Sequence, residues 1–241
     1  RIYTEESNRA ILQELLPEAV MTTYSLDETE SFEELPDLLE WADVLCIGCG
    51  LGMGPHSEEL LKKVLENNKT PAVIDADGLN LLAKTDEWGI EQIRMNPSGY
   101  VLTPHMKEMS RLTGWSIDTI MEDRFQALDQ IIKQSGPDTK SSIICVLKDS
   151  RTVVAQTNRQ RFVNLAGNNS MAKGGSGDVL AGTIAGLLAQ HMAPFEATTV
   201  GVFLHACGGD EAKKSKGSYS VLARDLIQGM ADAMKNAKEC R

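Results

Sequence analysis

Four short apolar runs, rich in β-branched residues, divide the first two thirds of the chain. Glycine, proline or charged residues bound them, which is typical of buried strands that end in turns. The runs lie at residues 43–47, 72–74, 100–102 and 143–147. We therefore expect four strands with little exposed surface.

Helical patterns fill much of the remaining sequence. Ser57 is expected to cap a helix whose apolar stripe follows at positions 60, 61, 64 and 65. Further helices are expected at residues 119–133, 178–190, 194–213 and 223–235. Alternation of strands and helices predicts an α/β fold with a mostly parallel central sheet, flanked by helices on both faces.

One segment interrupts this alternation. Two β-branched runs, at 152–155 and 161–164, flank the polar stretch 156–160. This pattern predicts a β-hairpin near 152–164, which adds antiparallel strands to the sheet. Because no long linker or internal repeat follows, we expect one domain over residues 1–241.

The chain is acidic. It has 24 Lys and Arg against 34 Asp and Glu, for a net charge of −10. Such a surface does not attract phosphates as a whole, which argues against a nucleic-acid or anionic-membrane partner. The longest apolar run, residues 179–189, is too short to span a bilayer. Any phosphate ligand must be held by a local device.

Five scattered cysteines do not form a disulfide framework, which favours a reduced, cytoplasmic protein. Cys46 and Cys49 have the CxxC spacing. However, no second pair follows and Cys46 lies in an expected buried strand, so the sequence favours neither zinc nor redox chemistry there.

A glycine-rich turn is the strongest chemical signal. Gly174, Gly175, Ser176 and Gly177 immediately precede the helix expected from residue 178. Glycines allow close backbone approach, and amides at a helix start attract phosphate, so this turn is a candidate anion hole. The plain alternative is a glycine loop without a ligand.

An acid follows the turn at once. Asp178 is suited to act as a general base that takes a proton from a substrate hydroxyl as the hydroxyl attacks a phosphoryl group. In isolation, Asp is also common at helix starts for structural reasons alone.

The residues around this turn resemble a known family. The pattern Asn-x-x-Met-Ala-x-Gly-Gly-x-Gly-Asp-x-Leu-x-Gly at 168–182 resembles the signature of the ADP/ATP-dependent NAD(P)H-hydrate dehydratases, in the ribokinase-like superfamily. Four further motifs resemble theirs in the same order, at residues 47–52, 73–80, 102–109 and 146–152, and residues 223–227 also fit.

The resemblance implies a ribokinase-like fold and a repair reaction. A nucleotide with Mg²⁺ phosphorylates the hydroxyl of hydrated NADH or NADPH (NADHX or NADPHX), and phosphate then leaves. ADP is the expected donor, with ATP as the alternative. The implied hydrate-binding residues are Gly50, Gly52, His105 and Asp178. The implied nucleotide-binding residues are Lys148, Asp149, Ser150, Arg151, Thr152 and Gly177.

Several acids are secondary candidates near the ion. Asp75, Asp77 and Glu108 could hold water around Mg²⁺, which keeps much of its hydration shell. Asn80 is a further candidate for the site. No metal ligand is assigned from the sequence.

The chain also departs from the family pattern. Cys49 stands where the family usually has Pro, and we find no counterpart of the family's first strand, glycine turn and helix. We therefore expect an N-terminally incomplete domain. Because a missing strand leaves an unpaired sheet edge, we expect a cover for that edge, either a separate N-terminal fragment or a neighbouring subunit of a homo-oligomer.

Two other functions fit parts of the pattern. A small-molecule kinase of the same fold, acting on a vitamin precursor or a sugar, would share the anion hole and Asp178. A non-catalytic nucleotide-binding protein would keep the fold without turnover. The segments at 75–80 and 103–105 favour the dehydratase.

Overall fold

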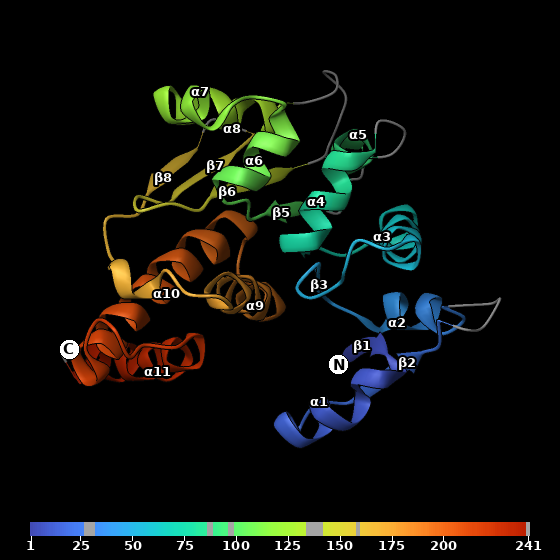
Figure 1. Ribbon diagram of the computed structural model, residues 1–241, viewed down its shortest axis with the longest axis horizontal. Helices are drawn as coiled ribbons and strands as arrows, with labels where there is room; N and C mark the ends of the chain where they lie inside the picture. Colours follow the sequence, from blue (N-terminus) through green and yellow to red (C-terminus); the bar gives the residue numbers. More distant parts are fainter. Residues whose placement is uncertain (27–31, 86–88, 96–98, 134–141, 158–159, 240–241) are drawn as a thin grey trace.

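The computed structural model describes residues 1–26, 32–85, 89–95, 99–133, 142–157 and 160–239. In these residues the main sheet has six strands, in the order β3-β4-β5-β6-β7-β8. A separate parallel pair, β1 and β2, lies beyond β3 (Figure 1). The strands are β1 (Ile2–Glu5), β2 (Met21–Tyr24), β3 (Leu45–Ile47), β4 (Ala72–Ile74), β5 (Tyr100–Leu102), β6 (Ile143–Leu147), β7 (Val153–Gln156) and β8 (Arg161–Val163).

Within the described residues of the main sheet, β7 alone runs opposite to the other strands. β3 to β6 are parallel, whereas β7 pairs antiparallel with β6 and β8. The mostly parallel sheet and the hairpin are therefore confirmed. Residues 158–159 of the expected hairpin turn lie outside the described residues.

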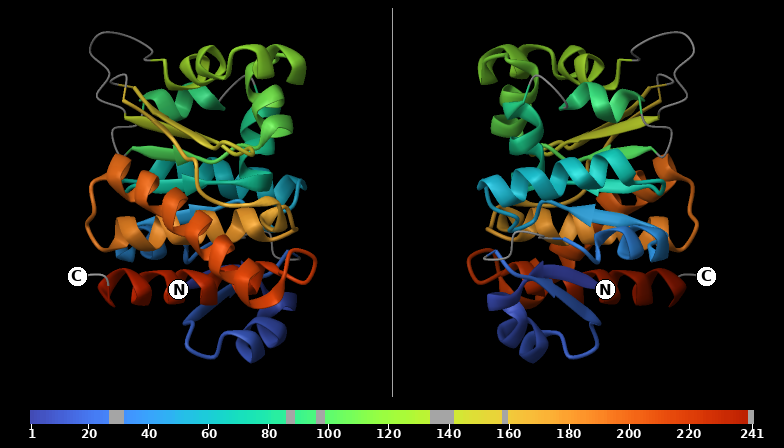
Figure 2. Two further views of the ribbon diagram at one scale, coloured as in Figure 1. Left: turned by 90° about the vertical axis from the view of Figure 1, so that its left-hand side faces the viewer. Right: turned by 90° about the vertical axis from the view of Figure 1, so that its right-hand side faces the viewer.

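Two apolar layers sandwich the sheet because neighbouring residues of a strand face opposite sides. Val73, Val101 and Ile144 pack under α9 and α10, whereas Ile74, Leu102 and Cys145 face the helices of the other layer (Figure 2). Helices on both faces are thus confirmed, and no described helix has the length and apolar character needed to cross a membrane. The helices are α1 (Arg9–Leu15), α2 (Leu35–Trp41), α3 (Pro55–Asn67), α4 (Ala76–Lys84), α5 (Ile90–Met95), α6 (Met106–Thr113), α7 (Ile117–Glu122), α8 (Arg124–Ile132), α9 (Ser176–Ala189), α10 (Pro194–Lys216) and α11 (Ala223–Glu239), with 3₁₀ turns at Glu6–Asn8 and Asn169–Met171.

Two helix predictions need correction. Ser57 does not cap α3, which begins at Pro55. Its hydroxyl instead donates to the Leu51 carbonyl at 2.7 Å. The single helix expected at 119–133 is two helices, because Asp123 takes a non-helical conformation and its carboxylate caps α8 by accepting from the Gln126 amide.

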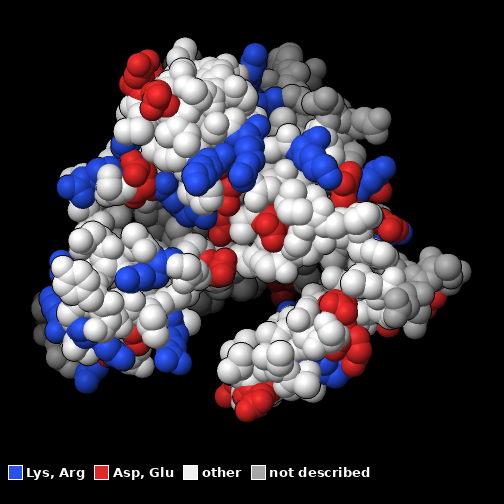
Figure 3. Space-filling view, in the orientation of Figure 1, with Lys and Arg blue, Asp and Glu red and all other residues white. Residues whose placement is uncertain are grey.

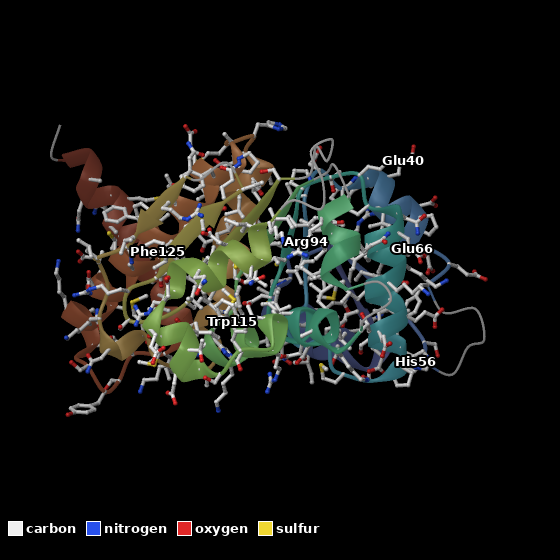
Figure 4. The ribbon with its side chains drawn as sticks, turned by 90° about the horizontal axis from the view of Figure 1, so that it is seen from above. Glu40, His56, Glu66, Arg94, Trp115 and Phe125 are labelled. Carbon is white, nitrogen blue, oxygen red and sulfur yellow. The ribbon has the colours of Figure 1, made fainter. Side chains whose placement is uncertain are left out.

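A contact between residues far apart in sequence caps the C-terminal end of α8. Arg94 of α5 donates to the carbonyls of Gln130 and Ile131, two of the last residues of α8 (Figure 4). An arginine that binds otherwise unpaired carbonyls stabilises a helix C-terminus. This contact holds the α5 segment against α8.

β3 forms one edge of the six-stranded sheet. Cys46, in its centre, is exposed, which corrects the expectation of a buried strand. The N-terminal unit, which comprises β1, α1 and β2, packs near β3 through a cluster that contains Tyr3, Tyr24 and Phe32. The ring centroids of Tyr24 and Phe32 are 4.9 Å apart. Between this unit and β3 is a cavity of about 280 Å³, lined by Tyr3 and Cys46 among others.

Candidate functional site

The candidate site lies where the parallel strands end. The carboxyl ends of β3, β4, β5 and β6 meet at one edge of the sheet, where α/β proteins commonly bind ligands. β5 and β6 remain linked beyond their ends, because the Lys148 amide donates to the Pro104 carbonyl at 2.8 Å. Residues far apart in sequence therefore share one small region.

A buried ion pair forms the floor of the site. The Asp75 carboxylate, at the end of β4, is 1% exposed and accepts from the Lys148 ammonium at 2.6 Å. A Cβ placed on Gly177 would lie 3.1 Å from Lys148 Nζ and 3.4 Å from Asp75 Oδ2. The backbone at Gly177 thus lies directly against the pair, and only glycine leaves this space open.

The glycine turn enters α9 through a left-handed residue. Gly175 caps the helix with φ of +84°, a conformation that favours glycine. The Ser176 amide donates to the Lys173 carbonyl at 3.2 Å, so it is not a free donor. The anion hole predicted from Gly174, Gly175, Ser176 and Gly177 stays a prediction.

Ser176 has a structural partner instead. Its hydroxyl lies 3.4 Å from Nε2 of His205, a buried residue of α10. Burial lowers the pKa of His205 to about 4, so the ring is neutral near pH 7. The pair connects the first turn of α9 to α10.

Asp178 is exposed in the first turn of α9. One oxygen of Asp178, one oxygen of Asp75 and the Cys49 sulfur all lie within 4.8 Å of one another. This trio mixes a soft thiol with hard carboxylates, and Lys148 already neutralises Asp75, so we assign no metal to it. Asp178 therefore stands at the mouth of the site, above the buried pair.

His105 has a structural role that the sequence did not indicate. Its Nδ1 accepts from the amides of Lys107 and Glu108, and the Glu108 carboxylate accepts from the His105 amide at 2.8 Å. This reciprocal cap begins α6. Burial and the Lys148 charge lower the pKa of His105, which favours a neutral ring with its proton on Nε2. The hydrate contact of His105 stays a prediction.

Glu108 connects this cap to the ion pair. It is buried, and its carboxylate is 3.9 Å from Lys148 Nζ. Burial raises its pKa. Glu108 therefore supports Lys148 and His105, rather than standing free to hold an ion.

The glycine turn after β3 is tightly held. Gly48, Gly50 and Gly52 have φ of +119°, +65° and +81°. The Gly52 amide donates to Asp77 at 2.8 Å, and a Cβ on Gly48 would lie 1.9 Å from the Asp75 carbonyl oxygen. Asp77 thus fixes the turn, whose exposed backbone at Gly50 and Gly52 is the predicted hydrate contact.

The predicted nucleotide segment turns outward after Lys148. Asp149 pairs with Arg124 at 2.8 Å, and the Thr152 hydroxyl donates to the Asp149 carbonyl at 3.2 Å. Ser150 and Arg151 are exposed. Lys148 therefore belongs to the floor of the site, whereas residues 149–151 are exposed and their contact with a nucleotide stays a prediction.

Two further residues lie outside the floor. Asn80 does not reach it, because its side chain accepts from Arg111 at 2.6 Å. Asp210 of α10 was not predicted, yet its carboxylate accepts from Asn168 at 2.7 Å and from the Gly167 amide at 3.2 Å. It anchors the approach to the glycine turn. Only Asn168, at the start of the motif, could have indicated that this loop needs a partner.

Comparison of the sequence with known proteins shows which family it matches. The profile of the NAD(P)H-hydrate dehydratase family matches residues 1–231. The chain is 37% identical over 90% of its length to the bifunctional NAD(P)H-hydrate repair enzyme of Moorella thermoacetica, and spans 40% of that protein. It is 34% identical over 93% of its length to the ADP-dependent (S)-NAD(P)H-hydrate dehydratase of Neisseria meningitidis, and spans 73% of it.

A solved structure agrees with these sequence matches. A ribokinase-like superfamily protein from Enterococcus faecalis superposes with a TM-score of 0.78 at 29% identity, over 97% of this chain and 75% of that one. This similarity confirms the predicted ribokinase-like fold.

Proposed function

Because this chain belongs to the NAD(P)H-hydrate dehydratase family, we propose that it restores NADH and NADPH from their hydrates at the site above Asp75, Lys148 and Asp178. ADP is the proposed phosphoryl donor, which the name of the Neisseria relative supports. The hydrate hydroxyl takes the phosphoryl group from ADP, leaving AMP, and then departs as inorganic phosphate. Phosphate is a far better leaving group than hydroxide.

One observation carries the proposal. An exposed carboxylate, Asp178, stands within 4.8 Å of Asp75, and the ammonium that neutralises Asp75 lies directly against the backbone of Gly177. A base, a fixed positive charge and a glycine opening are the parts that phosphoryl transfer to a hydroxyl needs.

The chain's own residues divide the work. Asp178 takes the proton from the attacking hydroxyl. Lys148, held in place by Asp75, offsets charge that develops on the transferred phosphoryl group. The amides of Gly174, Gly175 and Gly177 are the proposed donors to phosphate oxygens, and the tight turn at Gly50 and Gly52 leaves room for the hydrate.

Mg²⁺ fits this site as a companion of the nucleotide. Asp75 is bound to Lys148, Asp77 to the Gly52 amide and Glu108 to the His105 amide, so each of these acids already has a protein partner. The ion would therefore take most of its oxygen ligands from nucleotide phosphates and water, as Mg²⁺ often does. Bound there, it would supply additional neutralisation of phosphate charge.

The proposal is tested by supplying the purified protein with NADHX, ADP and Mg²⁺ and following the absorbance of restored NADH. Titration of ADP by calorimetry, on the same sample, separates nucleotide binding from turnover. ADP binding without any restored NADH would contradict the proposed activity and favour a non-catalytic binding protein.

Lys148→Met is expected to weaken ADP binding by about tenfold to a hundredfold, the usual range for loss of a charged hydrogen bond. Calorimetry measures this change. Because the variant leaves Asp75 buried without its partner, thermal unfolding must show that it is folded. Lys107→Met, at an exposed lysine of α6, is the matched control and should bind ADP normally. Equal affinity of the Lys148 and wild-type proteins would exclude Lys148 from the phosphate site.

We also propose a cytoplasmic homo-oligomer. β3 is a sheet edge beside a cavity that Trp41 and Leu39 help to line, and such edges are usually covered. The cover is a neighbouring subunit or a separate N-terminal fragment. Native mass spectrometry is expected to give an assembly heavier than the 26.3 kDa chain. A lone chain of that mass at micromolar concentration would contradict both versions.

A further inference from the structure

Two cysteines adjoin the proposed site without a part in its chemistry. Cys46 is in the edge strand β3, and Cys49 lies in the turn that follows it. Both are exposed, whereas Cys145 is fully buried in the sheet. One of the two premises that argued from sequence against a redox role, a buried Cys46, is therefore wrong.

Strand register places Cys46 on the face of the sheet that packs against α9. Cys46 pairs with Val73, so the two side chains share a face, and Val73 packs beneath α9. Cys49 reaches the same region, because its sulfur lies within 4.8 Å of both Asp75 and Asp178. The two cysteines are three residues apart, line the same cavity, and each shifts the pKa of the other.

The surroundings leave both thiols open to small molecules. Cys46 and Cys49 line the cavity of about 280 Å³ between β3 and the N-terminal unit, together with Gly48 and Leu51. The face drawn in Figure 3 is hollowed between the C-terminal helices at lower left and the N-terminal segment at lower right. Because both side chains are themselves exposed, a small reagent can reach them from solution.

We propose that Cys46 and Cys49 form an oxidisable dithiol, which closes to an intramolecular disulfide by exchange with a small-molecule disulfide and thereby lowers turnover at the adjoining site. Closure joins residues three apart, the spacing of known CxxC disulfide pairs. The lowered turnover rests on the proposed function, whereas formation of the disulfide does not.

The exchange proceeds in two balanced steps. The Cys46 thiolate attacks one sulfur of the small disulfide, whose S–S bond breaks and releases one thiolate. Cys49 then loses its proton to solvent and attacks the Cys46 sulfur, and the second small thiol leaves. The protein loses two electrons and two hydrogens, and the small disulfide becomes two thiols.

The interaction between the two thiols favours Cys46 as the attacking group. It lowers the pKa of Cys46, against the opposing effects of burial and of the Asp75 and Asp178 carboxylates, and it raises the pKa of Cys49. The thiolate is the nucleophile in disulfide exchange. The order of the two steps follows from this difference.

Closure must move the turn after β3. An S–S bond is about 2.05 Å long, which is shorter than any non-bonded contact between two sulfurs. Gly48 packs closely against the Asp75 backbone, whereas Gly50 has open space around it, so we expect the displacement at Gly50 and Gly52. Since these are the proposed hydrate contacts, oxidation should raise the KM for NADHX more than it weakens ADP binding.

The test uses the intact protein, treated with glutathione disulfide and then with N-ethylmaleimide. Peptide mass mapping should show the loss of two hydrogens in the segment that holds residues 46–49. The kcat/KM for NADHX should fall at least about tenfold, since a displacement on the order of 1 Å can cost a hundredfold, and dithiothreitol should restore it. Cys46→Ser should keep its activity through the treatment. Cys207→Ser, at a half-buried cysteine of α10, should respond like the native protein.

The outcomes separate cleanly. Failure to find the mass loss would overturn the proposal, and so would a disulfide that leaves kcat/KM unchanged. Loss of activity in the treated Cys46→Ser variant would assign the effect to another cysteine. If the reduced native protein has no turnover, the proposed function fails and the effect on turnover fails with it, while the mass shift still decides whether the disulfide forms.

Discussion

Asp178→Asn is expected to reduce turnover of NADHX by at least about 100-fold while ADP still binds, because the amide keeps the shape of the side chain but cannot accept the hydroxyl proton. This expectation rests on the position of Asp178, which is exposed at the start of α9 and within 4.8 Å of Asp75. Steady-state kinetics measures the loss, and calorimetry measures ADP binding.

A matched variant tests whether the loss of a carboxylate at a helix start is enough to lower turnover. Asp118 is an exposed acid in the first turn of α7, so Asp118→Asn makes the same change in the first turn of another helix. Each substitution should lower thermal stability slightly, by about 0.3–1 kcal/mol from the lost helix-dipole interaction. Only Asp178→Asn should lose turnover. Near-native activity in that variant would remove Asp178 from the mechanism.

Gly177→Val is expected to abolish measurable ADP binding. Its Cβ alone would lie 3.1 Å from Lys148 Nζ and 3.4 Å from Asp75 Oδ2, and the two further methyl groups would fill the space above the ion pair. Gly177→Ala should be milder, because the ammonium ends a flexible side chain that can shift a few tenths of an ångström. Calorimetry on both variants measures which of them binds ADP more weakly.

The control for this prediction is in the same helix. Gly182→Val makes the identical substitution where a Cβ meets nothing within 4 Å, and it should bind ADP like the native protein. If Gly177→Val is folded and binds ADP with native affinity, no phosphate approaches the helix at that point.

The sequence predicts the centre of the sheet and the hairpin well, and the burial of the edge strand β3 poorly. The runs at 72–74, 100–102 and 143–147 are buried strands, because apolar runs between turn residues leave little alternative. Cys46 breaks this rule, since its exposure depends on the place of β3 in the sheet, which local pattern does not encode. The break at Asp123 was missed because the apolar pattern continues across it.

The sequence likewise indicated some residues of the candidate site but not the contacts between them. The turn at 174–178 and the lysine at 148 were identified from motifs, each within a short stretch. The pairing of Asp75 with Lys148 joins residues 73 apart, and the contact of Asp210 with Asn168 joins residues 42 apart. Single-sequence periodicity holds no information on such contacts. The capping role of His105 was equally hidden, because histidine is an unusual helix cap.

The central claim is that one hydroxyl is phosphorylated and then lost as phosphate at a single site. The most direct test incubates the protein with NADHX and ADP in the presence of Mg²⁺ and quantifies NADH, AMP and inorganic phosphate in the same sample. We predict equal amounts of all three. AMP formed together with a stable phosphorylated product, without NADH and without free phosphate, would contradict the account and identify a kinase instead.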